Sequence, residues 1–220
     1  TYSKAFRAQS YLNIEGTPEE TIVNAYKALF NTNFKGIAYQ SLMNYYREKD
    51  KAKQNLYLQE GIDALKGDAE QKDLRANFVT ILMQNQFQAG DKEGFMKTAE
   101  IMKTEFADDE NAVNAYLMEG QFAFEAKDYE TAKKAFLAGS EKYPDDEKCL
   151  LMAARSPWMK AQTTGSKKED MNEAITLFKK LEAANPESPE LWGESLYVLY
   201  NNTQQPKLAA NYKKYYKSNK

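Results

Sequence analysis

Residues 116–144 read YLMEGQFAFEAKDYETAKKAFLAGSEKYP. Aromatic, small and proline residues recur in this stretch at helical spacing. In chain order they are Tyr116, Gly120, Phe124, Tyr129, Ala132, Phe136 and Pro144. The spacing predicts a hairpin of two amphipathic helices that ends at the proline. Because one such hairpin cannot bury its apolar faces alone, we expect stacked neighbours that form a helical repeat with an open inner surface.

The helical period continues on both sides of this hairpin, since apolar residues recur three and four positions apart and no alternating strand pattern lasts. We therefore predict an all-α fold, an alpha-alpha superhelix (solenoid) of about six antiparallel helix pairs. The predicted pairs are 2–11 with 18–31, 37–47 with 52–65, 69–88 with 95–106, 116–125 with 129–144, 147–162 with 171–186, and 191–201 with 207–216. We expect residues 1–220 to form a single domain.

Several polar segments lie where helices are expected to begin. Residues 17–20 read TPEE, a capping box with proline at the first helical position. Residues 108–110 and 145–147 are runs of three acids. Acids at such positions complement the helix dipole and cap free N–H groups, so we interpret both runs as structural.

The fifth helix pair departs from the others. Residues 156–158, with Pro157 at their centre, are expected to interrupt its first helix, and residues 163–167 lengthen its turn. Two interpretations of Trp158 follow. The indole either packs beneath a tolerated kink or forms, with the turn, a local recognition feature.

The charge pattern gives no sign of a nucleic-acid partner. The net charge of −2 comes from 30 basic and 32 acidic residues that are mixed along the chain. Residues 207–220 are the exception, because their only charges are positive and they include three tyrosines. We interpret this end as a solvated helix that caps the repeats, with a membrane surface or an acidic partner as the alternative.

The residue types available limit the chemistry. The chain has no histidine, which removes the commonest general base and transition-metal ligand. Cys149 is the single cysteine and lies in an apolar run, so we expect a small buried hydrophobe. We predict no catalytic residue, no metal site and no cofactor. A hydrolase built on two carboxylates is the weakest hypothesis.

The sequence also gives a prediction about location. No stretch approaches the ~20 consecutive apolar residues of a membrane helix. The chain begins at Thr1 without an initiator methionine, so we expect that an upstream segment was removed, either a signal peptide or lipid anchor, or residues trimmed in cloning. This predicts an extracytoplasmic protein, periplasmic or membrane-anchored, with a cytoplasmic location as the alternative.

The quoted hairpin resembles the tetratricopeptide repeat (TPR) family, whose unit is about 34 residues long. The six signature positions are matched by Tyr116, Gly120, Tyr129, Ala132, Phe136 and Pro144. Two positions depart from the pattern, since Glu119 replaces a leucine and Gly139 replaces an alanine. Further matches in the fifth and sixth pairs are Ala174, Phe178, Pro186, Trp192 and Tyr212. The resemblance is strongest over residues 111–216. The lack of disulfides and the many Asn, Gln, Lys and Tyr residues are similar to exported TPR proteins of Gram-negative bacteria.

The resemblance implies an inner groove formed by the first helix of each pair. Carried over by position, the groove-lining residues are Tyr39, Met43, Tyr46, Arg47, Gln84, Phe87, Gln88, Gln121, Phe124, Glu125, Tyr197, Tyr200 and Asn201. The family's carboxylate clamp is not expected, because Leu117 and Gln121 stand where it needs lysine and asparagine. Amides and aromatic rings suit an extended peptide backbone.

The resemblance therefore implies a non-enzymatic scaffold that binds a peptide segment or partner domain on its concave face. We expect Phe87, Phe124 and Tyr197 to supply most of the binding energy. The alternative is a carbohydrate-binding helper of a glycan-uptake system, with Tyr39, Tyr46, Tyr197 and Tyr200 as stacking platforms. For each of these residues the competing interpretation is that its side chain packs between repeats and binds no ligand.

Overall fold

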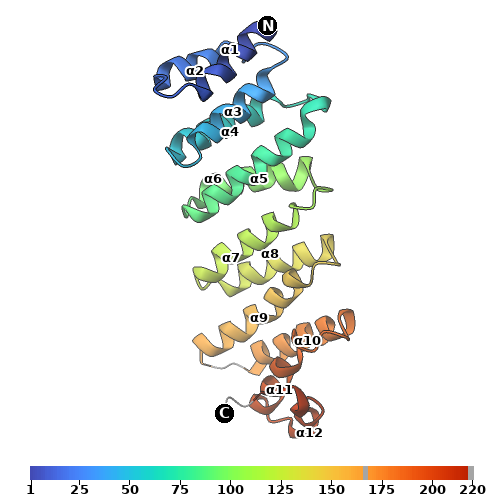
Figure 1. The fold of residues 1–220 in the computed structure, drawn as a ribbon. Helices are drawn as coiled ribbons and strands as arrows, with labels where there is room; N and C mark the ends of the chain where they lie inside the picture. Colours follow the sequence, from blue (N-terminus) through green and yellow to red (C-terminus); the bar gives the residue numbers. More distant parts are fainter. Residues whose placement is uncertain (166–167, 218–220) are drawn as a thin grey trace. The chain divides into compact units, whose positions relative to one another are not determined.

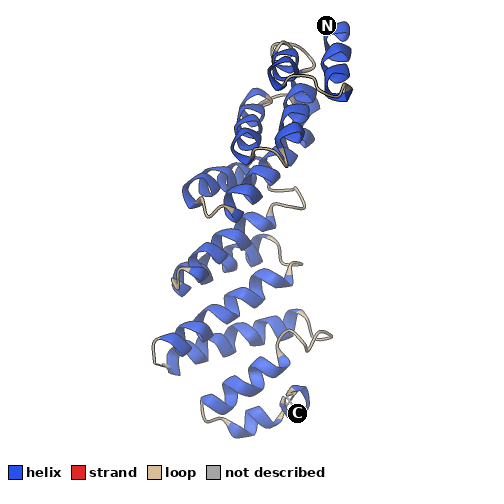
Figure 2. Ribbon diagram, turned by 60° about the vertical axis from the view of Figure 1, so that its left-hand side comes forward, coloured by secondary structure: helices blue, strands red, loops and turns tan. Residues whose placement is uncertain are grey.

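The structure is a computed structural model that describes residues 1–165 and 168–217. Helices and loops make up all of this described part (Figures 1 and 2). The chain divides into two compact units, Thr1–Asp109 and Glu110–Lys220. No helix in the described ranges combines the length and the apolar character that a membrane span requires.

The first unit contains three helix pairs. Its elements are α1 (Tyr2–Asn13), α2 (Glu19–Lys27), α3 (Lys35–Tyr46), α4 (Lys51–Ala64), a 3-10 turn (Ala69–Gln71), α5 (Lys72–Gln88) and α6 (Lys92–Glu105). Contacts run between chain neighbours, with α1 on α2, α3 on α4 and α5 on α6, and with α4 also packed on α5. Fully buried side chains of the core include Leu42, Leu58, Phe78 and Phe95.

The second unit contains the other three pairs. Its elements are α7 (Val113–Glu125), α8 (Tyr129–Lys142), α9 (Glu147–Thr163), α10 (Lys168–Ala184), α11 (Gly193–Asn202), α12 (Pro206–Ala210) and a 3-10 turn (Lys213–Tyr215). Helix α9 packs against both α8 and α10, and it also contacts α7 (Figure 1). The core is built on Phe136, Phe178, Leu181 and Leu196, which are almost fully buried.

The predicted helix pairs are thus confirmed in each unit, and aspartates begin many of the helices. Asp50, Asp91 and Asp128 each accept a hydrogen bond from the backbone N–H three residues ahead. Asp146 accepts from the N–H groups of Lys148 and Cys149 at 3.0 and 3.2 Å. This confirms the capping role of run 145–147. These caps satisfy N–H groups that have no partner within the helix.

Two predicted caps are wrong. Thr17 does not cap α2, because its hydroxyl donates to the Ile14 carbonyl at 2.8 Å and Pro18 takes the N-cap position. Helix α2 also ends at Lys27, before the predicted end at residue 31. The acidic run 108–110 does not supply the N-cap residue of α7, since α7 begins at Val113 after the N-cap residue Ala112. At Thr17 a local turn takes the hydroxyl that the pattern assigned to the helix.

The predicted interruption at Pro157 is also wrong, because α9 is one helix from Glu147 to Thr163. The proline removes one N–H from the helix. Ser156 beside it donates its hydroxyl to the Met152 carbonyl at 2.9 Å. Pro157 is buried between helices, so packing holds the helix together across it. The predicted long turn 163–167 extends into residues 166–167, which lie outside the described residues.

The chain end differs from the predicted basic helix. Helix α12 stops at Ala210, and a 3-10 turn follows. Tyr212 is buried in the core of the second unit, where it contacts Trp192 edge to face at 6.1 Å. Tyr212 therefore belongs to the core and is not part of a basic surface. The part of the predicted basic end at 218–220 lies outside the described residues.

Candidate functional site

The groove residues predicted on α3 are mostly buried. Tyr39, Met43 and Tyr46 are 7%, 2% and 2% exposed, and only Arg47 faces solvent. Tyr39 stacks on Phe30 at 4.1 Å, and the Tyr46 hydroxyl donates to Glu19 at 2.8 Å. These rings pack between neighbouring helices, because α3 has apolar residues on nearly every side. They leave no open ring face for a ligand.

The groove residues on α11 are divided between core and surface. Tyr200 is 7% exposed and stacks on Tyr212 at 5.7 Å. Tyr197 is half-buried and lies 4.7 Å from the ring of Tyr216, while Asn201 is exposed. Three of the four tyrosines proposed as sugar platforms are therefore buried in helix packing. Of the four, Tyr197 alone keeps accessible surface for stacking on a sugar.

The predicted groove residues on α5 and α7 lie nearer the surface. Gln84 and Phe87 on α5 are half-buried, and Gln88 is exposed. Phe87 contacts the buried ring of Phe95 edge to face at 6.2 Å. Part of each of these three residues is thus open to a partner.

On α7, Gln121 and Phe124 are half-buried and Glu125 is exposed. The Gln121 amide donates to Glu125 at 2.8 Å. Phe124 packs edge to face on Tyr129 at 5.2 Å. That contact holds the ring in place while one side of it lines a cavity described below.

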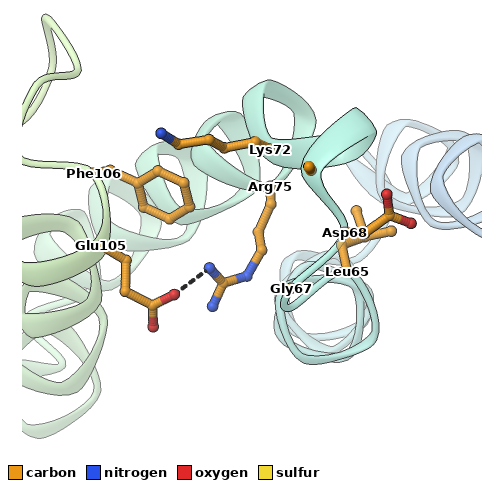
Figure 3. Close-up of a pocket in the computed structure, with 8 residues that line it drawn as sticks. Leu65, Gly67, Asp68, Lys72, Arg75, Glu105 and Phe106 are labelled. Carbon is orange, nitrogen blue, oxygen red and sulfur yellow. Dashed lines mark hydrogen bonds and ion pairs between the residues drawn. The ribbon is translucent and has the colours of Figure 1, made fainter.

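A polar pocket in the first unit lies between α4, α5 and α6 (Figure 3). Its central group is Arg75, which is 5% exposed. The Arg75 Nε donates to the Ile62 carbonyl at 2.7 Å, Nη1 donates to Glu105 at 2.5 Å, and the guanidinium lies 5.2 Å from the Phe106 ring. The Arg75 hydrogen bond lowers the pKa of Glu105. Since its bonds join α4 and α6, we interpret Arg75 as a structural clamp.

An ion-pair cluster in the second unit joins α8, α9 and α10. The carboxylates of Glu130, Asp170 and Glu173 lie within 4.8 Å of one another, the spacing of a metal site. Lys133 pairs with Glu130 and Glu173 at 2.9 and 2.6 Å, and Lys160 pairs with Glu130 and Asp170 at 2.6 and 3.0 Å.

Two ammonium groups therefore occupy the space among these acids and supply the positive charge that a cation would bring. The hydrogen bonds from Lys160 and Lys133 lower the pKa of Glu130 to about 2. Glu130 is ionised at neutral pH and is not a general acid there. The arrangement fits an interhelical salt-bridge network better than a metal centre or a carboxylate pair.

Cys149 is fully buried, as predicted. Burial raises the pKa of its thiol to about 12, and Asp146 adds to this rise. The thiol is therefore neutral at physiological pH and is a poor nucleophile. Gly139 lies directly against it, since a Cβ on that glycine would meet the Cys149 sulfur at 2.7 Å.

The second unit contains an apolar cavity of about 380 Å³ between α7 and α9. It is lined by Phe124, Met152, Arg155, Trp158, Met159 and Gln162. We call it the Trp158 cavity. It brings together the groove residue Phe124 and the candidate recognition residue Trp158, which the sequence places in different helix pairs.

Local structure explains why α9 presents this face. Met152, Arg155, Met159 and Gln162 recur at intervals of three and four, so they lie on one side of the helix. Trp158 is half-buried and packs edge to face on Phe178 at 6.0 Å. One part of the indole therefore packs on the core, as the first interpretation predicts, and another part lines the cavity. A recognition role for Trp158 stays a prediction.

Sequence reasoning missed four residues of this cavity. Met152, Arg155, Met159 and Gln162 went unnoticed because the first helix of the fifth pair matches the repeat pattern poorly and Pro157 suggested a break. Their regular spacing was the available signal. It would have been visible if the helix had been assumed to continue through the proline.

Comparison with known proteins supports the fold. No protein-family model matches the chain, and no curated protein is similar to it in sequence. A crystal structure of MamA protein superposes with a TM-score of 0.56 at 12% identity, over 83% of this chain and 90% of that one. MamA residues 41 to the end from Desulfovibrio magneticus RS-1 give 0.53 at 16% identity, over 81% and 90%. At these identities the likeness shows the fold alone, and it confirms the all-α, TPR-like helical-repeat class.

Proposed function

We propose that this protein is a non-enzymatic interaction scaffold that binds an extended segment of a partner protein at the Trp158 cavity. The observation behind this proposal is the cavity itself. It combines an apolar floor with a few polar groups at its edge, which is the usual composition of a ligand site. The TPR-like fold of the chain supports the proposal, since stacked helix pairs leave the inner side of their first helices open.

The lining residues suit a peptide for three reasons. Phe124 and Trp158 are large rings held by contacts on their far sides, so little entropy is lost when a ligand covers them. Met152 and Met159 adapt their shape to different apolar side chains. Gln162 can donate to and accept from a peptide backbone. Binding at the cavity would order few groups of the scaffold.

Outside the Trp158 cavity, the structure buries some of the predicted groove residues and leaves others accessible. The other groove residues that retain accessible surface stay predictions, and they are Arg47, Gln84, Phe87, Gln88, Gln121, Glu125, Tyr197 and Asn201. The location of the protein outside the cytoplasm and its single-domain organisation also stay predictions. Tyr39, Met43, Tyr46 and Tyr200 are not part of the proposed site, because helix packing buries them.

The test is a cross-linked pull-down with a matched pair of variants. Met159→Lys places a charge in the Trp158 cavity, whereas Thr176→Lys places the same charge on an exposed position of α10. We expect a protein that is captured by the wild type and by Thr176→Lys but lost with Met159→Lys. Circular dichroism must show both variants to be as helical as the wild type. Capture by all three proteins would place the binding surface elsewhere and contradict the proposal.

A further inference from the structure

The polar rim of the Trp158 cavity indicates the chemistry of the peptide. We propose that the cavity takes one bulky apolar side chain and that Arg155 pairs with the carboxylate of an Asp or Glu beside it in the peptide. This inference rests on the proposed function and adds the sequence class of the partner segment. Two observations support it: the free hydrogen-bond donors at the rim of the cavity and the volume of the cavity.

The rim offers hydrogen-bond donors that have no partner in the described part of the chain. Arg155 is exposed and forms no ion pair or hydrogen bond there, and the same holds for the indole N–H of Trp158 and the amide of Gln162. Of the six lining residues, Arg155 alone is charged. A guanidinium pairs best with a planar carboxylate through two parallel hydrogen bonds.

The neighbouring cation on α9 is already engaged. Lys160 pairs with Glu130 and Asp170 at 2.6 and 3.0 Å, so it is held away from a ligand. The nearest acid in sequence to the cavity floor is Glu125, which accepts from Gln121 and is not among the lining residues. The charge presented at the cavity is therefore positive, which favours an acidic partner.

The cavity volume is sufficient for one large side chain. About 380 Å³ lies at the low end of the ~300–1,000 Å³ of small-molecule sites. Its floor consists of Phe124, Met152, Trp158 and Met159, which touch a ligand without specific hydrogen bonds. We therefore expect the floor to accept Phe, Leu, Met or Trp, and the charge of the neighbouring residue to set the preference.

Spacing places the carboxylate near the apolar side chain. Arg155 lies three residues from Met152 and four from Met159, and such helical neighbours are about 5–6 Å apart. An extended peptide advances about 3.3 Å per residue. The acid is thus one or two residues from the apolar residue, in either direction along the peptide.

The test is a titration that is monitored by the methyl signals of methionine in the full chain. The probes are acetyl-Ser-Glu-Phe-Glu-Ser-amide and the same peptide with Gln or Lys at both Glu positions. We expect saturable shifts at Met152 and Met159. Because an ion pair at an exposed arginine is screened by solvent, affinity should be a few-fold higher for the Glu peptide than for the Gln peptide and lowest for the Lys peptide.

Two variants of the arginine isolate the ion pair. Arg155→Gln should erase the preference for Glu over Gln and leave the affinity of the Gln peptide unchanged, and Arg155→Glu should make the Lys peptide the tightest. Lys148→Gln is the matched control, because it removes one exposed positive charge from the same helix. The control should keep the wild-type preference.

Each other outcome overturns a defined part of the inference. Equal affinity for all three peptides, lost with Met159→Lys, would refute the acidic preference and leave the proposed function intact. No shift at Met152 or Met159 with any peptide would refute both. Tighter binding of acetyl-Ser-Gln-Phe with a free C-terminus than of the Glu peptide would show that a chain terminus supplies the carboxylate.

Discussion

At the residue scale, small side chains decide how closely the helices approach. Gly120 on α7 is fully covered by the ring of Phe136 on α8, since a Cβ at this glycine would lie 2.6 Å from two ring atoms. Real Cβ atoms are essentially never that close to a neighbour. The sequence predicted a tight crossing here from the glycine position in the repeat, and the structure confirms it.

Gly120→Leu should lower the free energy of unfolding by at least about 2 kcal/mol. Phe136 is 1% exposed and has no room to move, so the added side chain overpacks the core, which typically costs ~1–3 kcal/mol. Urea unfolding followed by circular dichroism measures the change. Ala138→Leu, at an exposed position of α8, is the control and should stay within about 0.5 kcal/mol. A Gly120→Leu protein as stable as the wild type would show that the crossing is loose.

At the element scale, contacts between helices override local preferences along them. A proline would end an isolated helix. Helix α9 nevertheless continues through Pro157, because both of the neighbouring helices, α8 and α10, pack against α9. The same three helices are joined by the ion pairs of Lys133 and Lys160. The helix that sequence reasoning expected to be broken is therefore the best-supported element of the second unit.

The stability of the second unit should depend on pH through Glu130. Its pKa falls from 4.5 to about 2 in the folded protein, so its ion pairs stabilise the fold fully above pH ~4.5. That contribution is lost as the pH falls from about 4.5 to about 2. Glu130→Gln should be less stable than the wild type at pH 7 and should flatten the dependence of stability on pH in this window.

Urea unfolding at a series of pH values between 2 and 7 measures this dependence. Glu141→Gln, at an exposed position of α8, removes the same charge outside the network and should keep the wild-type slope. High salt should reduce the difference, because the Glu130 side chain is 45% exposed and is screened by solvent. Identical slopes for Glu130→Gln and wild type would mean that the network contributes nothing to stability.

At the scale of the whole molecule, each helix packs mainly on its neighbours in the chain, and the chain divides into two compact units. Stability in such an architecture is a sum of local terms and neighbour interfaces. A core defect in one unit should therefore be felt mostly within that unit. Two glycines that are each covered by a phenylalanine ring, Gly61 under Phe78 and Gly120 under Phe136, make this testable.

Hydrogen exchange measured by mass spectrometry should separate the two units. Gly120→Leu should accelerate exchange of core amides in residues 110–217 and leave residues 1–109 near wild type, and Gly61→Leu should do the reverse. Exchange near the global unfolding limit reports the stability of the unit that contains the amide. Uniform acceleration across the chain by either variant would show that the two units unfold as one.

The sequence by itself determined the helices, their pairing and most of their beginnings, because these depend on spacing and capping within a few residues. It also identified Gly120 and Cys149 correctly as a close contact and a buried thiol. It did not determine which aromatic residues of the first helices stay open. Tyr39, Tyr46 and Tyr200 have the same helical spacing as accessible rings.

Only the tertiary structure decided those questions, because burial depends on what a neighbouring helix places opposite each side chain. The three tyrosines are covered by Phe30 in the turn after α2, by Glu19 at the start of α2 and by Tyr212 in the turn after α12. The Trp158 cavity likewise exists because α7 and α9 lie side by side, which brings Phe124 next to Trp158. Local patterns specify which face of a helix is apolar, and packing between helices specifies how much of that face remains for a partner.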